Sequence, residues 1–266
     1  MSPIDKLFTT LRSQGRKALM PFVTAGDPDL EFTGQIIREL DRVGSSMCEV
    51  GIPYSDPIAD GPVIQASYTR ALEKKIKVHH IFELLRGLKD EVKMPRVTMV
   101  SYAIIHRYGA ERYVAEAQAA GVSGAIVPDL LVEEAESLAT ICRKADFSLI
   151  QLVTPTTPRE RAVRIANSSS GFLYYVSVTG ITGERTQLPP QLLENVSWLR
   201  TQTKLPICIG FGISQPEHVK LLAPVADGLI VGSAIVRRVA QAATRSRAEV
   251  VKEVGEYVQS LQEAVK

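Results

Sequence analysis

The sequence predicts an α/β protein: one closed (β/α)8 barrel that spans residues 1–266 as a single domain, with an extra helix at its N-terminus. Eight short apolar runs alternate with helical patterns, and this alternation is typical of parallel strands joined by crossover helices. The runs are apolar throughout, as expected for strands covered on both faces. The length of 266 residues matches the roughly 250 that such barrels fill as one domain.

Each predicted strand is an apolar run of six or seven residues that ends in turn residues. An open, doubly wound sheet is the alternative, but no Gly-x-Gly-x-x-Gly follows the first run, which disfavours it. In barrels of this kind the chemistry lies at the C-terminal ends of the strands. The strands are predicted at residues 18–24, 46–51, 96–102, 124–129, 148–154, 172–177, 206–212 and 228–233.

Amphipathic segments between the runs predict the covering helices, because their apolar residues recur with helical spacing. Residues 1–14 form a similar short segment without the apolar core of a signal sequence, and no apolar run reaches about 18 residues. We therefore expect a cytoplasmic protein that does not enter a membrane. The clearest helices are predicted at residues 31–44, 80–92, 110–121, 132–145 and 158–168.

Composition excludes several partners and cofactors. The net charge is +2 with no long basic run, so nucleic acid is not an expected partner. Cys48, Cys142 and Cys208 lie far apart, with neither metal-ligand nor disulfide spacing, and an odd number of cysteines in apolar surroundings fits reduced, buried thiols. The four histidines, which we expect at the surface, lack the spacing of a metal pair. No metal site is predicted.

Glycines at the ends of the last two strands predict a phosphate site. The seventh strand ends in "GFGIS" (210–214) and the eighth in "VGSAI" (231–235), where a short helix would begin at Ser233. Glycine lets backbone N–H groups approach an anion, and helix N-termini favour phosphate. These are also the strand ends that most often hold phosphate in such barrels. The alternative is that the glycines only make tight turns.

The segment after the sixth strand predicts a closing loop. Gly180 and Gly183 flank Thr182, and polar residues and two prolines follow. Closing loops exclude water and complete catalytic sites. Gly183 would be a third contributor to the phosphate site. The alternative is an ordinary surface loop.

Two carboxylates near the second strand are the strongest catalytic candidates. Glu49 lies inside an apolar run, and a carboxylate is rarely buried unless it is paired. An apolar pocket would raise its pKa and suit it to give and take a proton. The alternative is an outward-facing Glu49 paired with a helix. Asp60 lies in a loop too long for an ordinary connection, and it could instead cap a turn.

Four aromatic residues lie in the predicted strands or at their ends. They are Phe22, Tyr102, Tyr174 and Phe211. They could be ordinary core residues, or they could wall a pocket for a flat aromatic substrate.

Six segments resemble the family of tryptophan synthase α subunits: "PFVTAGDPD", "EVGIPYSDPIADGPVIQ", "VPDLLVEE", "SVTGITGER", "GFGIS" and "VGSAIV". The resemblance runs in order from Leu19 to Val236 and covers most of the chain. The second segment is the most specific, because few other barrels place a Glu and an Asp eleven residues apart in such a frame.

The resemblance implies a TIM barrel that cleaves indole-3-glycerol phosphate into indole and glyceraldehyde 3-phosphate. It implies no cofactor in this chain, and a β-subunit partner in an α2β2 complex that uses pyridoxal phosphate to join indole to serine. Glu49 would be the acid–base residue and Asp60 the second carboxylate. The substrate would contact Phe22, Val100, Tyr102, Tyr174, Thr182 and Phe211, and the phosphate Gly183, Gly212, Gly232 and Ser233.

Three other functions are weighed against this one. A stand-alone lyase that releases free indole would carry similar strand-end residues. A sugar-phosphate isomerase would need an acid–base pair elsewhere, and the first strand ends in Thr24 with no carboxylate inside the barrel. A non-catalytic regulatory subunit would not need both Glu49 and Asp60.

Overall fold

The computed structural model describes residues 1–57, 60–177, 190–210 and 212–265. Within them, nine strands form one sheet in which every neighbouring pair is parallel. The sheet order is β5-β4-β3-β2-β1-β9-β8-β7-β6. The strands are β1 (Ala18–Thr24), β2 (Cys48–Gly51), β3 (Arg96–Met99), β4 (Val122–Ile126), β5 (Ser148–Ile150), β6 (Leu152–Val153), β7 (Leu173–Val176), β8 (Ile207–Gly210) and β9 (Gly228–Val231).

One interrupted strand closes the sheet into a barrel. β5 and β6 occupy the single strand predicted at 148–154 and are separated only by Gln151. β5 pairs with β4, while β6 pairs with β7. The backbone N–H of Tyr174 also donates to the carbonyl of Gln151 at 3.1 Å. The two ends of the sheet are thus one segment of chain, and the predicted eight-stranded barrel is confirmed.

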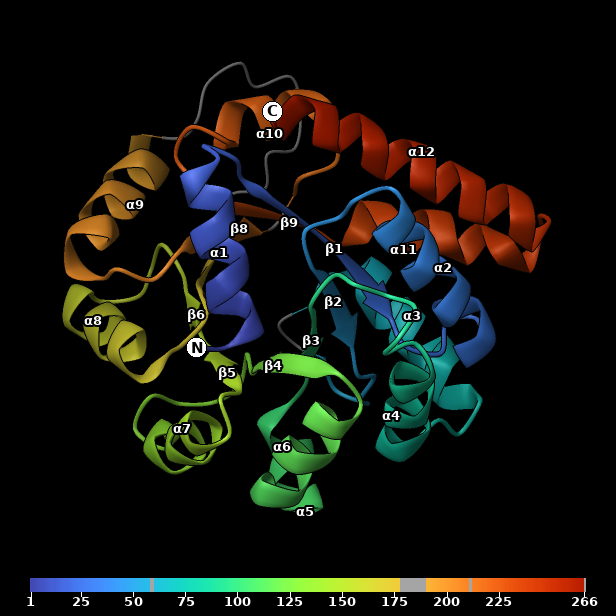
Figure 1. The fold of residues 1–266 in the computed structure, drawn as a ribbon, viewed down its shortest axis with the longest axis horizontal. Helices are drawn as coiled ribbons and strands as arrows, with labels where there is room; N and C mark the ends of the chain where they lie inside the picture. Colours follow the sequence, from blue (N-terminus) through green and yellow to red (C-terminus); the bar gives the residue numbers. More distant parts are fainter. Residues whose placement is uncertain (58–59, 178–189, 211, 266) are drawn as a thin grey trace.

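Helices form a ring around the strands (Figure 1). The five predicted helices correspond to α2, α4, α6, α7 and α8, and a short helix begins at Ser233 as expected. No helix within the described residues is long and apolar enough to cross a bilayer. The helices are α1 (Pro3–Ser13), α2 (Leu30–Arg42), α3 (Pro62–Glu73), α4 (Val78–Gly87), α5 (Tyr102–Tyr108), α6 (Ala110–Ala119), α7 (Ala135–Lys144), α8 (Arg159–Ser168), α9 (Pro190–Gln202), α10 (Pro216–Leu222), α11 (Ser233–Val239) and α12 (Arg247–Val265).

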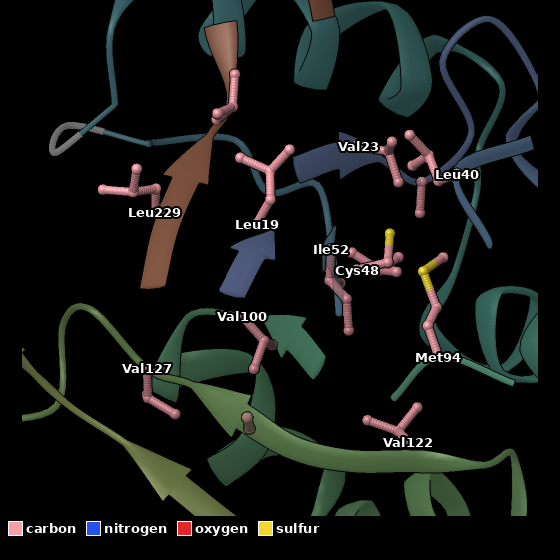
Figure 2. Packing of buried hydrophobic residues seen from close by; sticks show 14 of the residues in the cluster. Leu19, Val23, Leu40, Cys48, Ile52, Met94, Val100, Val122, Val127 and Leu229 are labelled. Carbon is pink, nitrogen blue, oxygen red and sulfur yellow. The ribbon is translucent and has the colours of Figure 1, made fainter. Parts of the chain in front are cut away.

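Alternate side chains of each strand face two separate cores. The inner core fills the barrel with residues such as Met20, Val97, Ile126 and Ile150. The outer core lies between strands and helices; Figure 2 shows part of it, with Leu19, Cys48, Val100 and Leu229 among the labelled side chains. Because the side-chain period of a strand is two, one inward-facing residue fixes the direction of its neighbours along the strand.

The N-terminal helix α1 covers one end of the barrel, and Figure 1 shows it lying across the centre of the ring. Ser2 caps its N-terminus by accepting from the backbone N–H of Asp5, while the Asp5 carboxylate accepts from the N–H of Ser2. Ile4, Phe8 and Leu11 pack into the inner core, and the rings of Phe8 and Phe172 lie 6.0 Å apart. These contacts seal the amino ends of the strands.

An ion pair between the buried Asp27 and the partly exposed Arg70 attaches α3 to the opposite, carboxyl end. Asp27 follows β1 and is 1% exposed, and its carboxylate accepts two hydrogen bonds from Arg70 of α3, at 2.8 and 2.6 Å. Such a bidentate pair fixes direction as well as distance. Gly61 and Pro62 begin α3 immediately after the loop that carries Asp60, so this pair positions that loop.

We expect Asp27→Asn to lower the free energy of unfolding by about 2–3 kcal/mol, because it leaves Arg70 without its charged partner. Urea denaturation measures the change. Glu136→Gln is the matched control: its pair with Arg143 is exposed, so this change should lower the free energy of unfolding much less. Equal costs for the two variants would contradict an anchoring role for Asp27.

Candidate active site

A cavity of about 320 Å³ opens at the carboxyl ends of the strands. It lies at the end of the barrel opposite α1, where barrels of this class carry their chemistry. Strands β1, β2, β3, β7 and β9 each contribute a side chain to it. The remainder comes from the loop before α3, from the first turn of α3 and from the segments after β8 and β9. Its lining residues are Phe22, Glu49, Asp60, Gly61, Ile64, Met99, Tyr174, Gly212, Ile213, Ser214, Ile230, Gly232, Ser233, Ala234 and Arg237.

Glu49 faces into the barrel from β2, where it stands beside Phe22 of β1 and Val97 of β3 in the sheet register. Its side chain is 2% exposed, and neither carboxylate oxygen has a hydrogen-bond partner among the described residues. Burial, and secondly the nearby charge of Asp60, raise the pKa of Glu49 to about 8. Glu49 is therefore mostly protonated at neutral pH, and it is not the outward-facing, paired residue of the alternative.

Asp60 lines the same cavity from the loop before α3. Its backbone is held at both polar groups: the N–H donates to Pro57 at 3.0 Å, and the carbonyl accepts from Gln65 at 2.8 Å. The carboxylate accepts no hydrogen bond from a described residue. Burial raises the pKa of Asp60 to about 6, so most of it remains ionised at pH 7. The cavity thus holds one protonated and one ionised carboxylic acid, a pattern typical of acid–base sites.

Two glycines make room for the aromatic walls. A Cβ on Gly51 would lie 2.5 Å from Cζ of Phe22, and a Cβ on Gly210 would lie 2.2 Å from the hydroxyl oxygen of Tyr174. Any larger residue at either strand end would displace the ring that lies over it. The structure thus places Phe22 and Tyr174 in the wall of the cavity. The neighbouring Tyr175 faces the outer core instead, where its hydroxyl accepts from Asn195.

The predicted phosphate residues Gly212, Gly232 and Ser233 all line the cavity. Glu49 and Asp60 are the acidic residues among its described lining residues. Gly212 has φ +78°, a conformation that favours glycine, and Ser233 begins α11. Arg237, one helical turn later, also lines the cavity and has no ion pair with a described residue.

Arg238 differs from Arg237 because its side chain is already engaged. It donates to the carbonyl of Ala234 at 2.8 Å, and its guanidinium lies 3.6 Å from the ring centre of Tyr257. Sequence reasoning missed Arg237. The helical spacing from Ser233 to Arg237 was the signal that could have found it.

Two predicted substrate residues do not reach the cavity. Val100 is buried in the outer core (Figure 2). Tyr102 begins α5, where its backbone N–H donates to Asp129 at 2.7 Å, and its ring packs against the outer core. Met99 takes the inward position instead. Val97 pairs with the inward-facing Glu49 and also faces inward, so the next inward residue of β3 is two positions later, at Met99. Thr182, Gly183 and Phe211, together with the predicted closing loop, lie outside the described residues.

The remaining polar and sulfur-bearing residues show no second centre in the described part of the chain. All three cysteines are buried and unpaired, as expected. His218 is buried rather than at the surface as predicted, and its Nδ1 accepts from the backbone N–H of Ser214 at 3.3 Å. In the described residues no three His, Cys, Asp or Glu side chains gather in a way that could hold a metal ion.

Comparison with known proteins identifies one family. The family model of the tryptophan synthase alpha chain matches residues 8–266. A tryptophan synthase alpha chain from Rhodopirellula baltica is 60% identical and covers 100% of this chain and 99% of its own length; one from Microcystis aeruginosa is 44% identical, with 100% of both chains covered. The crystal structure of tryptophan synthase subunit alpha from Legionella pneumophila has a TM-score of 0.90 at 34% identity, covering 100% of this chain and 98% of that one.

The buried acid predicts how stability depends on pH. The pKa of Glu49 is about 8 when folded, against an ordinary value of 4.5, so the folded state binds more protons between these values. Stability from this group is therefore present at low pH and falls as pH rises from about 4.5 to 8. We expect Glu49→Gln to gain stability over the original chain by up to about 1.4 kcal/mol per pH unit in this window.

Urea denaturation of both chains at several pH values measures the difference, in which other titrating groups largely cancel. A difference that does not vary with pH would contradict a raised pKa for Glu49.

Proposed function

Since the chain belongs to the tryptophan synthase alpha chain family, we propose that Glu49 and Asp60 perform the reaction of that family, the cleavage of indole-3-glycerol phosphate to indole and glyceraldehyde 3-phosphate. The chain is a carbon–carbon lyase of tryptophan biosynthesis. The observation that carries the residue assignment is the shared cavity of two carboxylic acids with pKa values of about 8 and about 6.

Glu49 supplies and recovers a single proton. In its protonated form it donates to carbon 3 of the indole ring, which turns the ring into a leaving group. The resulting carboxylate then accepts the proton of the side-chain hydroxyl next to the ring, as the bond from carbon 3 to that carbon breaks and an aldehyde forms. Indole and glyceraldehyde 3-phosphate result, and Glu49 is protonated again. A pKa near the working pH suits both transfers.

Asp60 stabilises the charge that this proton transfer creates. Protonation at carbon 3 leaves positive charge on the ring nitrogen, and an ionised carboxylate accepting from that N–H stabilises it. Such an interaction is stronger inside a protein, where charges are screened less than in bulk water. Asp60 must stay ionised for this role, and its pKa of about 6 allows it at neutral pH.

The walls of the cavity fit the two unlike halves of the substrate. Phe22, Tyr174, Ile64, Met99 and Ile230 present flat or apolar surface to the indole ring. At the other side, Gly212, Gly232 and Ser233 offer backbone groups to the phosphate, and Arg237 adds a positive charge. Thr182, Gly183 and Phe211 stay predictions from the resemblance.

We further propose that the chain works with a tryptophan synthase β subunit in an α2β2 complex in the cytoplasm. The partner would hold pyridoxal phosphate, and this chain would need no cofactor. The names of the relatives support this assembly, and the stand-alone lyase is not favoured. Leu131, 54% exposed in the loop after β4, is a large apolar side chain available to a partner. The isomerase and regulatory-subunit readings are set aside, because both carboxylates line the cavity.

We expect Glu49→Gln to abolish indole release in single-turnover assays while the substrate still binds, because glutamine keeps the size of the side chain but transfers no proton. Asp60→Asn should slow release by roughly 100-fold or more, through lost stabilisation of the ring charge. Calorimetry measures substrate binding in parallel. Substantial release by Glu49→Gln would refute the acid–base assignment.

The phosphate end is tested through Arg237. Arg237→Gln should raise KM for indole-3-glycerol phosphate about tenfold, roughly 1.4 kcal/mol, with little change in kcat, since the cation acts on the phosphate and not on the reacting bond. Gly232→Ala should also raise KM, because the added methyl group would occupy space that the phosphate needs. The protein itself can accept the methyl group, since its nearest atom would be 3.8 Å away.

Arg16→Gln is the matched control. It removes the same charge just before β1, at the sealed end of the barrel. An equal rise of KM in both arginine variants would show a general charge effect and would contradict a phosphate contact at Arg237.

A further inference from the structure

Three of the seven buried side-chain polar atoms that lack a hydrogen-bond partner in the described part of the chain lie in or next to the active site. They are both carboxylate oxygens of Glu49 and the hydroxyl of Tyr68. Buried polar groups are almost always paired, so an unpaired one needs an explanation. The mechanism above accounts for Glu49, whose oxygens face the substrate. It gives Tyr68 no role.

Tyr68 comes from α3, one helical turn after the cavity residue Ile64, and is 1% exposed. Its hydroxyl oxygen lies 2.8 Å from the position that a Cβ on Gly51 would take, next to the ring of Phe22. Gly51 follows Glu49 by two residues on the inward face of β2. The hydroxyl therefore lies at the level of Gly51, nearer the open end of the barrel than Glu49, and next to the ring of Phe22.

The loop that carries Asp60 lies beside the same hydroxyl. The ring of Tyr54, at the start of that loop, packs 5.5 Å from the ring of Tyr68. Asp60 ends the loop only two residues before α3 begins. After burial itself, the charge of Asp60 is the largest influence that raises the pKa of Tyr68, so Tyr68 keeps its proton and remains a donor. An unpaired donor and a carboxylate with no described partner thus lie in one corner of the site.

We propose that Tyr68 is a positioning residue: in the substrate complex its hydroxyl donates to the Asp60 carboxylate and keeps it ionised and turned toward the ring N–H. The inference rests on the proposed function. Glu49 is not the acceptor, because a hydrogen bond to its ionised form would oppose its work as an acid. The titratable and charged groups that line this cavity or face Asp60 are Glu49 of β2, Tyr54 of the loop, Tyr68 of α3, Tyr174 of β7 and Arg237 of α11.

The sign of the pH effect follows from the donor. Asp60 acts only when ionised, so kcat falls as pH drops through its pKa in the complex. A donor on the carboxylate favours the ionised form and lowers that pKa. Removing the donor raises it, and the acid limb of the kcat profile moves to higher pH.

Tyr68→Phe tests the proposal, because it removes one oxygen and leaves the ring in place. We expect kcat for indole release from indole-3-glycerol phosphate to fall on the order of 10- to 100-fold, the range for a hydrogen bond to a charged group. The pH below which kcat falls should be higher in the variant than in the original chain. The melting temperature should stay level or rise, since an unpaired buried hydroxyl is gone.

Tyr113→Phe is the matched control. Tyr113 is equally buried, but it lies in the outer core and its hydroxyl pairs with Thr98 at 2.8 Å. This variant should lower the melting temperature and leave kcat and the pH profile unchanged. Unchanged kcat in Tyr68→Phe, or an acid limb that stays in place, overturns the inference. If the original chain itself releases no indole, the proposed function fails, and the inference fails with it.

Discussion

A carboxylic acid inside the barrel, with no hydrogen-bond partner among the described residues, is the constraint around which the site is arranged. Burying an ionised carboxylate is costly, so Glu49 keeps its proton and its pKa rises to about 8. This works only in a dry, rigid pocket. Phe22 and Tyr174 supply the walls, and the missing side chains of Gly51 and Gly210 leave space for their rings. A neutral Glu49 is therefore a property of the packed barrel as much as of the residue.

The two ends of the barrel have different roles: the amino end contributes packing, and the carboxyl end holds the cavity. At the amino end, α1 inserts Ile4, Phe8 and Leu11 into the inner core. At the carboxyl end, unpaired polar atoms are retained at a cost to stability. The sealed end, the closed sheet and the Asp27–Arg70 pair together compensate for that cost and hold the loop of Asp60 against the cavity.

The sequence alone predicted those features of the fold and the site that depend on patterns of nearby residues. Alternating apolar and helical segments predicted the barrel, and an acid inside an apolar run identified Glu49. Register between strands is a long-range property, and the sequence shows it poorly. The resemblance implied Val100 in the pocket, whereas pairing of Glu49 with Val97 turns Met99 inward. The helix α3 was missed because the Pro- and Gly-rich loop hid its start at Pro62, and with it the inward position of Tyr68.

The cavity also has an electrical polarity that would select one orientation of the substrate under the proposed function. Glu49 and Asp60 lie on the side of β2 and the loop before α3, whereas Gly212, Gly232, Ser233 and Arg237 come from the segments after β8 and β9. A ligand with a neutral ring and a phosphate dianion can satisfy both sides in one direction only. Turned around, its phosphate would meet an ionised Asp60 while Arg237 faced an uncharged ring, and such juxtaposed like charges cost several kcal/mol. The charge that we propose to help catalysis would thus also reject the wrong orientation.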